Sequence, residues 1–469
     1  MSQGLLPYTV ETVAAPDGVT ARAGLPLVLE ALRALGLDRV IAEQVCVRER
    51  ESGYSEAEKV EALVLLLAAG GTCLDDIALL QADGGLGRLL GRKLPAADTL
   101  RHFLYAFHDD QLLAQAQAAR PPGTVAYIPA ETAALQGLAR VTTALVHGVI
   151  AQGHATAATL DHDATLQESH KREALPHYQG GRGYQPAALY WAEQDLVVAD
   201  EYRDGNVPAG MHNLPLIQRG FASLPPTVTA YYFRADSACY DERILKWLAD
   251  PQRPGGPAGP LGFTISADMS EDLHRACAAV PAAAWQPFED RPEETVTVTE
   301  VGFTPGDWPK TAWPLRYLAL RIQRKQGNLF TGPALKYLAV VTNRDGAIGP
   351  LLRWHWQKAG TIELVHDVTK NELGAAVTPC GRFGANAAWY RLSLLTYNVL
   401  SALKSLALPA HLSAARPKRL RFALFTLPGR LVTHAGRLLL RISAEAERLV
   451  GLIAARTRLA ALRPQAASG

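Results

Sequence analysis

Apolar residues over the first 150 positions recur at helical spacing, which predicts an N-terminal helical region. The segment SEAEKVEALVLLLAAGG begins with Ser55, has Glu58 three residues later as a capping box, and ends in two glycines that favour a helix stop. In AADTLRHFLYAFHDD, Asp98 is the candidate N-cap of a further helix. The chain therefore opens as helices over residues 1–150.

The pattern changes near position 155 to short runs rich in Thr, Val, Leu and aromatic residues, which predicts strands. These runs are TLDHDATL, AALYWAEQ and DLVVADEY, and the last two are spaced for a hairpin. The segment VTAYYFRADS is a further strand, and a helix is predicted from Asp241. Strands and helices in this order predict a mixed α/β core whose first part covers residues 151–250.

A second part of the chain is richer in β-formers. A Pro/Gly-rich loop, DPQRPGGPAGPLG, precedes the strands EETVTVTEVGF, RYLALRIQRK and KYLAVVTN, which predicts a β-rich insertion over residues 251–350. Helical spacing returns in AGTIELVHDVTKNELGA and in a long helix ending at Pro409, so residues 351–410 complete the core. We expect the remaining tail, residues 411–469, to be basic and helical.

Charge is distributed unevenly although the whole chain carries only +2. Residues 1–100 have a net charge of −5 and residues 411–469 a net charge of +9. A basic tail of this kind is typical of a segment that docks on a polyanion. The five cysteines include no CxxC pair, which argues against a structural zinc site or a disulfide framework and fits a reducing cytoplasm. We expect no membrane association, because the longest apolar run is about half a membrane span.

Acids stand at three places where burial is otherwise expected. Asp161 and Asp163 lie two apart on one strand and so share a face. Asp236 ends a run of β-formers, and Glu363 shares a helix face with Lys370. Taken one at a time, each acid has an ordinary structural explanation. Asp161 could be a solvated residue at a strand end, Asp236 could cap a turn, and Glu363 could lie on a solvated helix face. Together they are the oxygen donors that a pair of Mg²⁺ ions needs, provided that they converge.

These segments resemble DDE transposases of bacterial insertion sequences, in the branch with a Tyr-x2-Arg-x3-Glu-x6-Lys motif around the third acid. The resemblance rests on TLDHDATLQESHKR, RADSACY and WHWQKAGTIELVHDVTKNELG. It implies a ribonuclease-H-like core that carries Asp163, Asp236 and Glu363 as the catalytic, metal-binding acids, with Asp161 beside the metal. It also implies two Mg²⁺ ions, for which Mn²⁺ can substitute.

The same resemblance assigns DNA contacts. Lys370 matches the motif's lysine and Trp356 stands at its tyrosine, but Ala359 replaces its arginine. Arg353 or Lys358 is then the substitute cation. In the tail, the segment RPKRLR supplies further candidate phosphate contacts, namely Arg416, Lys418, Arg419 and Arg421.

These features predict a cytoplasmic, nucleoid-associated transposase. It would bind double-stranded DNA at the inverted repeats of its own element, cut the ends and join each 3′-hydroxyl to target DNA. The resemblance implies a homodimer on DNA, with the N-terminal helices in DNA binding or dimerisation. Two alternatives stay open: a catalytically inactive DNA-binding derivative, which the Ala359 departure favours, and a metal-dependent nuclease.

Overall fold

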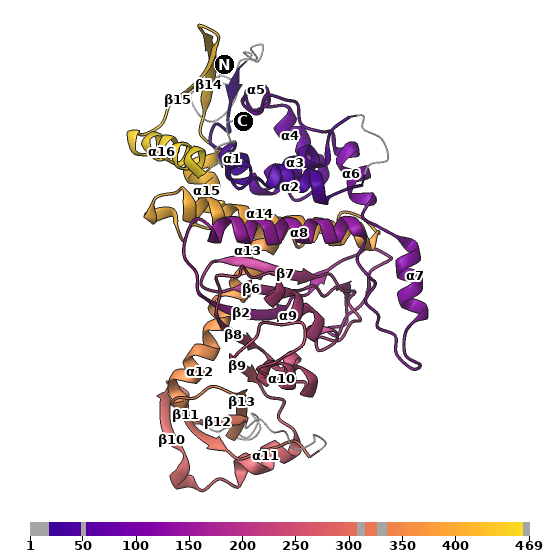
Figure 1. Cartoon of the computed structure of the whole chain (residues 1–469), viewed down its shortest axis with the longest axis vertical. Helices are drawn as coiled ribbons and strands as arrows, with labels where there is room; N and C mark the ends of the chain where they lie inside the picture. The colour runs from indigo at the N-terminus through magenta and orange to yellow at the C-terminus, as the bar shows by residue number, and fades with distance from the viewer. Residues whose placement is uncertain (1–17, 48–52, 307–314, 326–334, 463–469) are drawn as a thin grey trace, which may run out of the picture.

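The computed structural model describes residues 18–47, 53–306, 315–325 and 335–462. The molecule is elongated, with most of its helices at one end. One large sheet runs from the middle to the other end (Figure 1). The first and the last described segments, β1 and α16, both lie at the helical end. The architecture is mixed α/β, as the sequence predicts.

Fifteen strands are present in the described chain. They are β1 Val19–Thr20, β2 Ala157–Ala164, β3 Gln167–Glu168, β4 Leu175–Pro176, β5 Arg182–Tyr184, β6 Ala187–Trp191, β7 Leu196–Glu201, β8 Ala230–Ala235, β9 Leu261–Ser266, β10 Gln286–Asp290, β11 Glu294–Val301, β12 Arg316–Arg324, β13 Leu335–Thr342, β14 Gly429–His434 and β15 Arg437–Ile442.

The described part of the chain also forms sixteen α-helices. They are α1 Leu27–Ala34, α2 Leu37–Gln44, α3 Glu56–Ala68, α4 Ile77–Gln81, α5 Gly84–Leu90, α6 Ala97–Tyr105, α7 Asp110–Ala118, α8 Ala133–Ile150, α9 Asn213–Ala222, α10 Glu242–Ala249, α11 Glu271–Ala278, α12 Ile348–Trp356, α13 Ile362–Glu372, α14 Phe383–Leu406, α15 Pro417–Leu420 and α16 Ala446–Leu462.

Nine strands form one sheet in the order β10-β11-β12-β13-β9-β8-β2-β6-β7. The pairs β2–β8 and β8–β9 are parallel, whereas the other neighbours are antiparallel. The predicted hairpin is confirmed as β6 and β7, and the predicted helix at Asp241 as α10, which Asp241 caps. The strand β2, with the paired acids, thus lies inside the sheet rather than at its edge.

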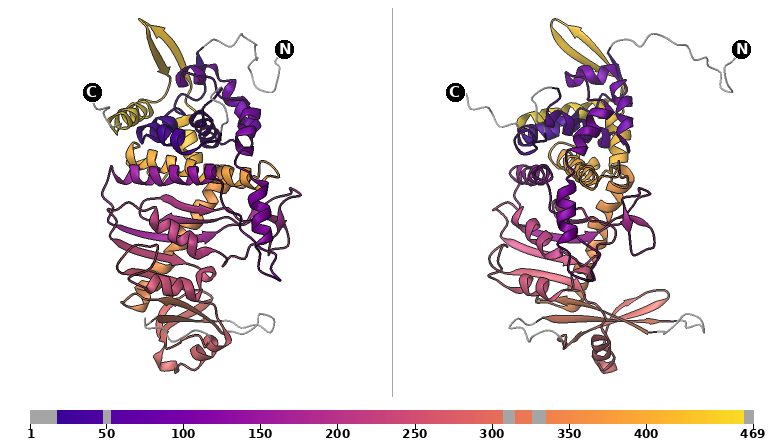
Figure 2. Two further views of the ribbon diagram at one scale, coloured as in Figure 1. Left: turned by 45° about the vertical axis from the view of Figure 1, so that its right-hand side comes forward. Right: turned by 90° about the vertical axis from the view of Figure 1, so that its right-hand side faces the viewer.

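The helices α8 and α14 lie side by side across the sheet, between it and the N-terminal helices (Figures 1 and 2). Helix α8 is apolar and long enough to cross a membrane by composition, but it packs against α2, α14 and β7. The capping box of α3 is confirmed, since Ser55 and Glu58 bond each other's backbone. The predicted cap at Asp98 is wrong, because α6 begins after Ala96 and Asp98 instead pairs with Arg101.

The predicted β-rich insertion does not form a sheet of its own. Its strands β10 to β13 continue the central sheet, joined through the antiparallel pairing of β13 with β9. One face of these strands packs against α12 in a separate small core that includes Leu318, Leu320 and Leu352. The other face belongs to the main core.

The prediction of a helical tail is only partly correct. Between α15 and α16 the chain forms the hairpin β14–β15, which pairs with β1. Its two turn residues, Ala435 and Gly436, both have positive φ, as a tight two-residue hairpin turn requires. Figure 2 shows this hairpin projecting beyond the helices.

Candidate active site

The parallel register of β2 and β8 brings two predicted acids level with each other. Asp161 lies opposite Arg234 in this register. Asp163 and Asp236 each follow two residues later, so both lie at the carboxyl ends of neighbouring parallel strands. Crevices at such strand ends are where open α/β sheets bind ligands.

Asp161 is fully buried and its charge is compensated within the protein. Arg234 donates from Nε to Oδ1 at 2.6 Å and from Nη2 to Oδ2 at 2.8 Å, and Thr361 donates a further bond to Oδ2. Arg234 also donates to the carbonyl oxygen of Trp354 at the end of α12. Both oxygens of Asp161 thus accept hydrogen bonds within the protein, and its predicted metal-adjacent role stays a prediction.

Asp163 and Asp236 share one buried cation, Lys358. The Lys358 ammonium lies 3.4 Å from Asp163 Oδ1. Burial raises the pKa of both aspartates, and the positive charge of Lys358 opposes that rise in each. The negative charge of Asp163 raises the pKa of Asp236 further. Asp236 also caps the turn that follows β8 by accepting a bond from the amide of Ala238.

Helix α13 approaches β2, but Glu363 is not turned inward. Glu363 stands in the first turn, is exposed, and has no hydrogen bond or ion pair among the described residues. The side chain that faces Asp163 is His366, whose Nε2 lies 3.9 Å from Oδ2, too far for a hydrogen bond. Burial lowers the pKa of His366 to about 3, so the ring is neutral near pH 7.

Lys370 anchors the far end of α13 to the segment after β2. Its ammonium donates to the carbonyl oxygen of Leu166 at 2.7 Å and to the Thr165 hydroxyl at 3.3 Å. Burial lowers the pKa of Lys370. The predicted phosphate contact of Lys370 stays a prediction, and its ammonium holds α13 beside the acids.

The other residues predicted to bind DNA near the acids lie in different surroundings. The ring of Trp356 packs against the ring of Phe288. The guanidinium of the exposed Arg353 lies 4.9 Å from the centre of the Phe288 ring. Lys358 is buried beside Asp163, and its predicted role as a substitute for the missing arginine stays a prediction. Ala359 lies in a short 3₁₀ segment, Gln357–Gly360, that ends before α13 begins.

The predicted cluster in the tail divides into two kinds of residue. Arg416 bonds Asp367 and Glu372, and Arg421 donates to the carbonyl oxygens of Ala68 and Glu372, so both hold the tail against the core. In contrast, Lys418 and Arg419 are exposed on α15.

The donor set fits a divalent cation at Asp163 and Asp236. Two carboxylates with pKa values raised by burial already face one positive charge, and carboxylate oxygens are the ligands that Mg²⁺ prefers. Within the part of the chain that the structure describes, no three His, Cys, Asp or Glu side chains are arranged to hold a metal ion. Glu363 would therefore have to turn inward to join the two aspartates.

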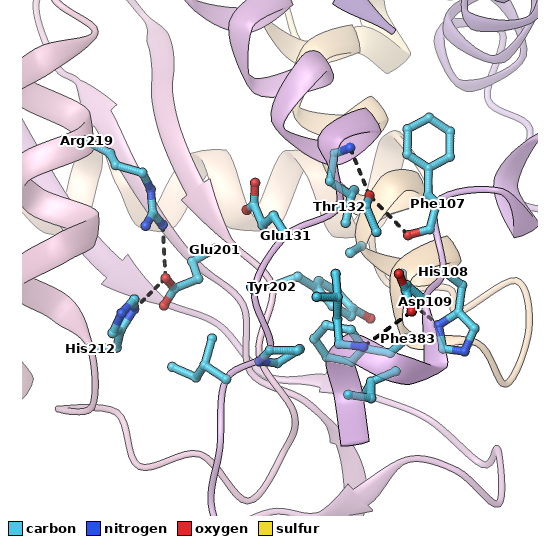
Figure 3. Close-up of a pocket in the computed structure, with 18 residues that line it drawn as sticks. Phe107, His108, Asp109, Glu131, Thr132, Glu201, Tyr202, His212, Arg219 and Phe383 are labelled. Atoms are coloured by element: carbon cyan, nitrogen blue, oxygen red, sulfur yellow. Dashed lines mark hydrogen bonds and ion pairs between the residues drawn. The ribbon is translucent and has the colours of Figure 1, made fainter. Parts of the chain in front are cut away.

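A cavity of about 310 Å³ lies elsewhere, between the start of α8, the end of β7 and the start of α14 (Figure 3). None of the three predicted acids lines it. Its Glu201 already forms ion pairs with Arg203 at 2.7 Å and Arg219 at 3.0 Å, and His212 Nδ1 lies 2.7 Å from it. This cavity is therefore distinct from the acidic centre.

The sequence predicts no role for Arg234 or His366, and it predicts Lys358 as a DNA contact rather than as a partner of Asp163. The partnership of Arg234 with Asp161 depends on strand register, which spacing along one chain does not reveal.

Comparison with known proteins places the chain in a family. No curated protein sequence matches the chain. Among solved structures, the cryo-EM structure of a piggyBac transposase synaptic complex with hairpin DNA has a TM-score of 0.47 and 10% sequence identity, covering 86% of this chain and 81% of that one. The family described as Transposase DDE domain group 1 matches residues 9–464. Since that match spans nearly the whole chain, the protein belongs to the DDE transposase family.

Proposed function

We propose that this protein cuts DNA at the ends of its own mobile element and joins the freed 3′-hydroxyls to target DNA. The observation that carries the proposal is the level placement of Asp163 and Asp236 at neighbouring strand ends, around one buried positive charge. We also propose that β2, β8 and α13 belong to a ribonuclease-H-like core. The substrate would be double-stranded DNA, bound by a homodimer in the cytoplasm.

In this mechanism Asp163 and Asp236 would hold divalent metal ions, together with Glu363 once its side chain has turned inward from the first turn of α13. Bound there, such ions would supply activation of the attacking water and neutralisation of charge on the phosphate. Asp161 and Arg234 keep β2 and β8 in register, so the two aspartates stay level. Lys370 holds α13 close enough for Glu363 to approach.

The proposal is tested by cleavage of a duplex that carries the element's end sequence. Asp163→Asn, Asp236→Asn and Glu363→Gln should each reduce Mg²⁺-dependent cleavage severely, while DNA binding in filter or gel-shift assays stays close to wild type. Asp367→Asn is the matched control, because Asp367 is an exposed acid on the same helix whose partner is Arg416. Cleavage by wild-type protein in the presence of a chelator would contradict the mechanism.

A second function is favoured by Ala359 and by the exposed position of Glu363. In this alternative the chain is a DNA-binding derivative that does not cut. It predicts normal binding of the end duplex with no cleavage in Mg²⁺ or Mn²⁺, even at high protein concentration. A metal-dependent nuclease, in contrast, would cleave without joining the products to a second DNA.

A further inference from the structure

The C-terminal hairpin β14–β15 has two chemically different faces. Because side chains alternate along a strand and paired residues share a face, Leu431, Leu440 and Ile442 lie on one side. This side packs at its base against the main core, and Arg88 donates from below to Thr433. The hairpin is thus fixed to the helical end of the molecule by one face.

The opposite face is basic and open. Arg430 pairs directly with Arg441, and His434 pairs with Arg437 beside the turn. Val432 lies between these pairs with its partner Leu439, which is 39% exposed. The whole hairpin, residues 429–442, has no acidic residue.

The side chains of Arg430, Arg437 and Arg441 are exposed and take part in no hydrogen bond or ion pair within the described residues, whereas Arg234 and Arg416, for example, each bond a carboxylate. Like charges directly opposite each other on paired strands destabilise a hairpin. The opposed Arg430 and Arg441 are therefore slightly unfavourable in the free protein, and a negatively charged partner would relieve their repulsion.

We propose that the basic face of β14–β15 is a contact for double-stranded DNA. A two-stranded ribbon has the width that the major groove admits, and arginines on its two strands can reach phosphates on both sides. Val432 and Leu439 between them provide apolar contact with the groove. This inference rests on the proposed function, and it moves the tail's main DNA contact from the cluster at residues 416–421 to the hairpin.

The test compares two triple variants that remove the same charge. One is Arg430→Gln/Arg437→Gln/Arg441→Gln. The control is Arg243→Gln/Arg275→Gln/Arg291→Gln, whose side chains are 84%, 73% and 42% exposed toward the other end of the molecule. Binding to a random-sequence duplex several helical turns long is measured over a salt series. Circular dichroism melting and light scattering check the fold and the oligomeric state.

The hairpin variant should flatten the dependence of log K on log salt by about 0.9 for each lost phosphate contact, so by about 2–3 in total. The control should keep the wild-type slope. If wild-type protein binds the duplex but the hairpin variant has an unchanged slope, this inference fails alone. A changed oligomeric state with an unchanged slope would also overturn it, in favour of an interface between copies. If wild-type protein binds no duplex at low salt, the proposed function fails as well.

Discussion

Lys358 is the residue whose position most changes the interpretation of the site. Its ammonium lies beside Asp163 and acts on Asp236, where a divalent cation is expected to bind. A monovalent ammonium stabilises two carboxylates but also competes with a metal ion for them. In the proposed mechanism, Lys358 would therefore set how readily the two aspartates accept a metal ion.

Lys358→Met should raise the affinity of the protein for Mn²⁺ by about tenfold, a change of about 1.4 kcal/mol, because the competing charge is removed. Isothermal titration calorimetry without DNA measures this directly, independent of cleavage. Lys370→Met is the control, since the Lys370 ammonium bonds a carbonyl and a hydroxyl rather than the aspartates. Weaker Mn²⁺ binding by Lys358→Met would show that the lysine supports the metal rather than competing with it.

Asp204 is a second residue whose surroundings have a measurable consequence. It is 5% exposed, and burial alone raises its pKa to about 7. The folded protein then holds a proton that the unfolded chain releases near pH 4, so this group makes the protein less stable as pH rises from about 4 to 7.

Asp204→Asn should therefore raise the free energy of unfolding at pH 8 by about 2–4 kcal/mol, since each unit of pKa shift corresponds to about 1.4 kcal/mol. At pH 4 the variant and wild type should differ little. Urea unfolding at both pH values measures the difference. Asp110→Asn, at a side chain that is 96% exposed, controls for the change in net charge. Equal stabilisation at pH 4 and pH 8 would contradict the assignment.

Between neighbouring elements, the Asp161–Arg234 pair joins β2, β8 and the end of α12. Arg234→Met should lower the free energy of unfolding by about 3–5 kcal/mol, because it leaves a buried carboxylate without its partner. Adding Asp161→Asn should recover much of that loss. Urea unfolding near pH 7 tests both variants. If Arg234→Met is as stable as wild type, the pair does not hold the strands.

Helix starts and turns that are determined by residues close in sequence could be predicted from the sequence. Those that are determined by contacts with residues distant in sequence could not. Ser55 and Glu58 cap α3 as their three-residue spacing indicates. Asp98 satisfies the same local rule, yet the chain enters α6 earlier and Asp98 bonds Arg101. The hairpin turn at Ala435-Gly436 carries a weak signal, because alanine is uncommon at positive φ.

The candidate site divides in the same way. The strand pattern placed Asp163 on a strand and Asp236 at the end of another, and the parallel register of β2 and β8 brings them level. The catalytic roles of these two acids and of Glu363 stay predictions. Spacing along one helix could not show that His366 rather than Glu363 faces Asp163, because that depends on how α13 is rotated against β2.

Across the whole molecule, one sheet serves two cores. The main core lies under the helical layer, whereas strands β10 to β13 share a small second core with α12. Helix α12 leads directly into the segment that carries Lys358. The stability of the second core therefore bears on the position of the cation in the acidic centre.

The two cores should open separately in native-state hydrogen exchange, because few apolar side chains support the smaller one. Leu320 is 2% exposed in the small core and Leu160 is 0% exposed in the main core, so they form a matched pair. Leu320→Ala should lower protection by about 2–5 kcal/mol in β10–β12 and α12, and leave β6 and β7 unchanged. Leu160→Ala should lower protection in β6 and β7 as well as in β10–β12, since the main core includes side chains from both parts of the sheet. Equal loss of protection in β6 and β7 for both variants would mean that the sheet unfolds as one unit. In that case α12 could not move Lys358 without unfolding the acidic centre itself.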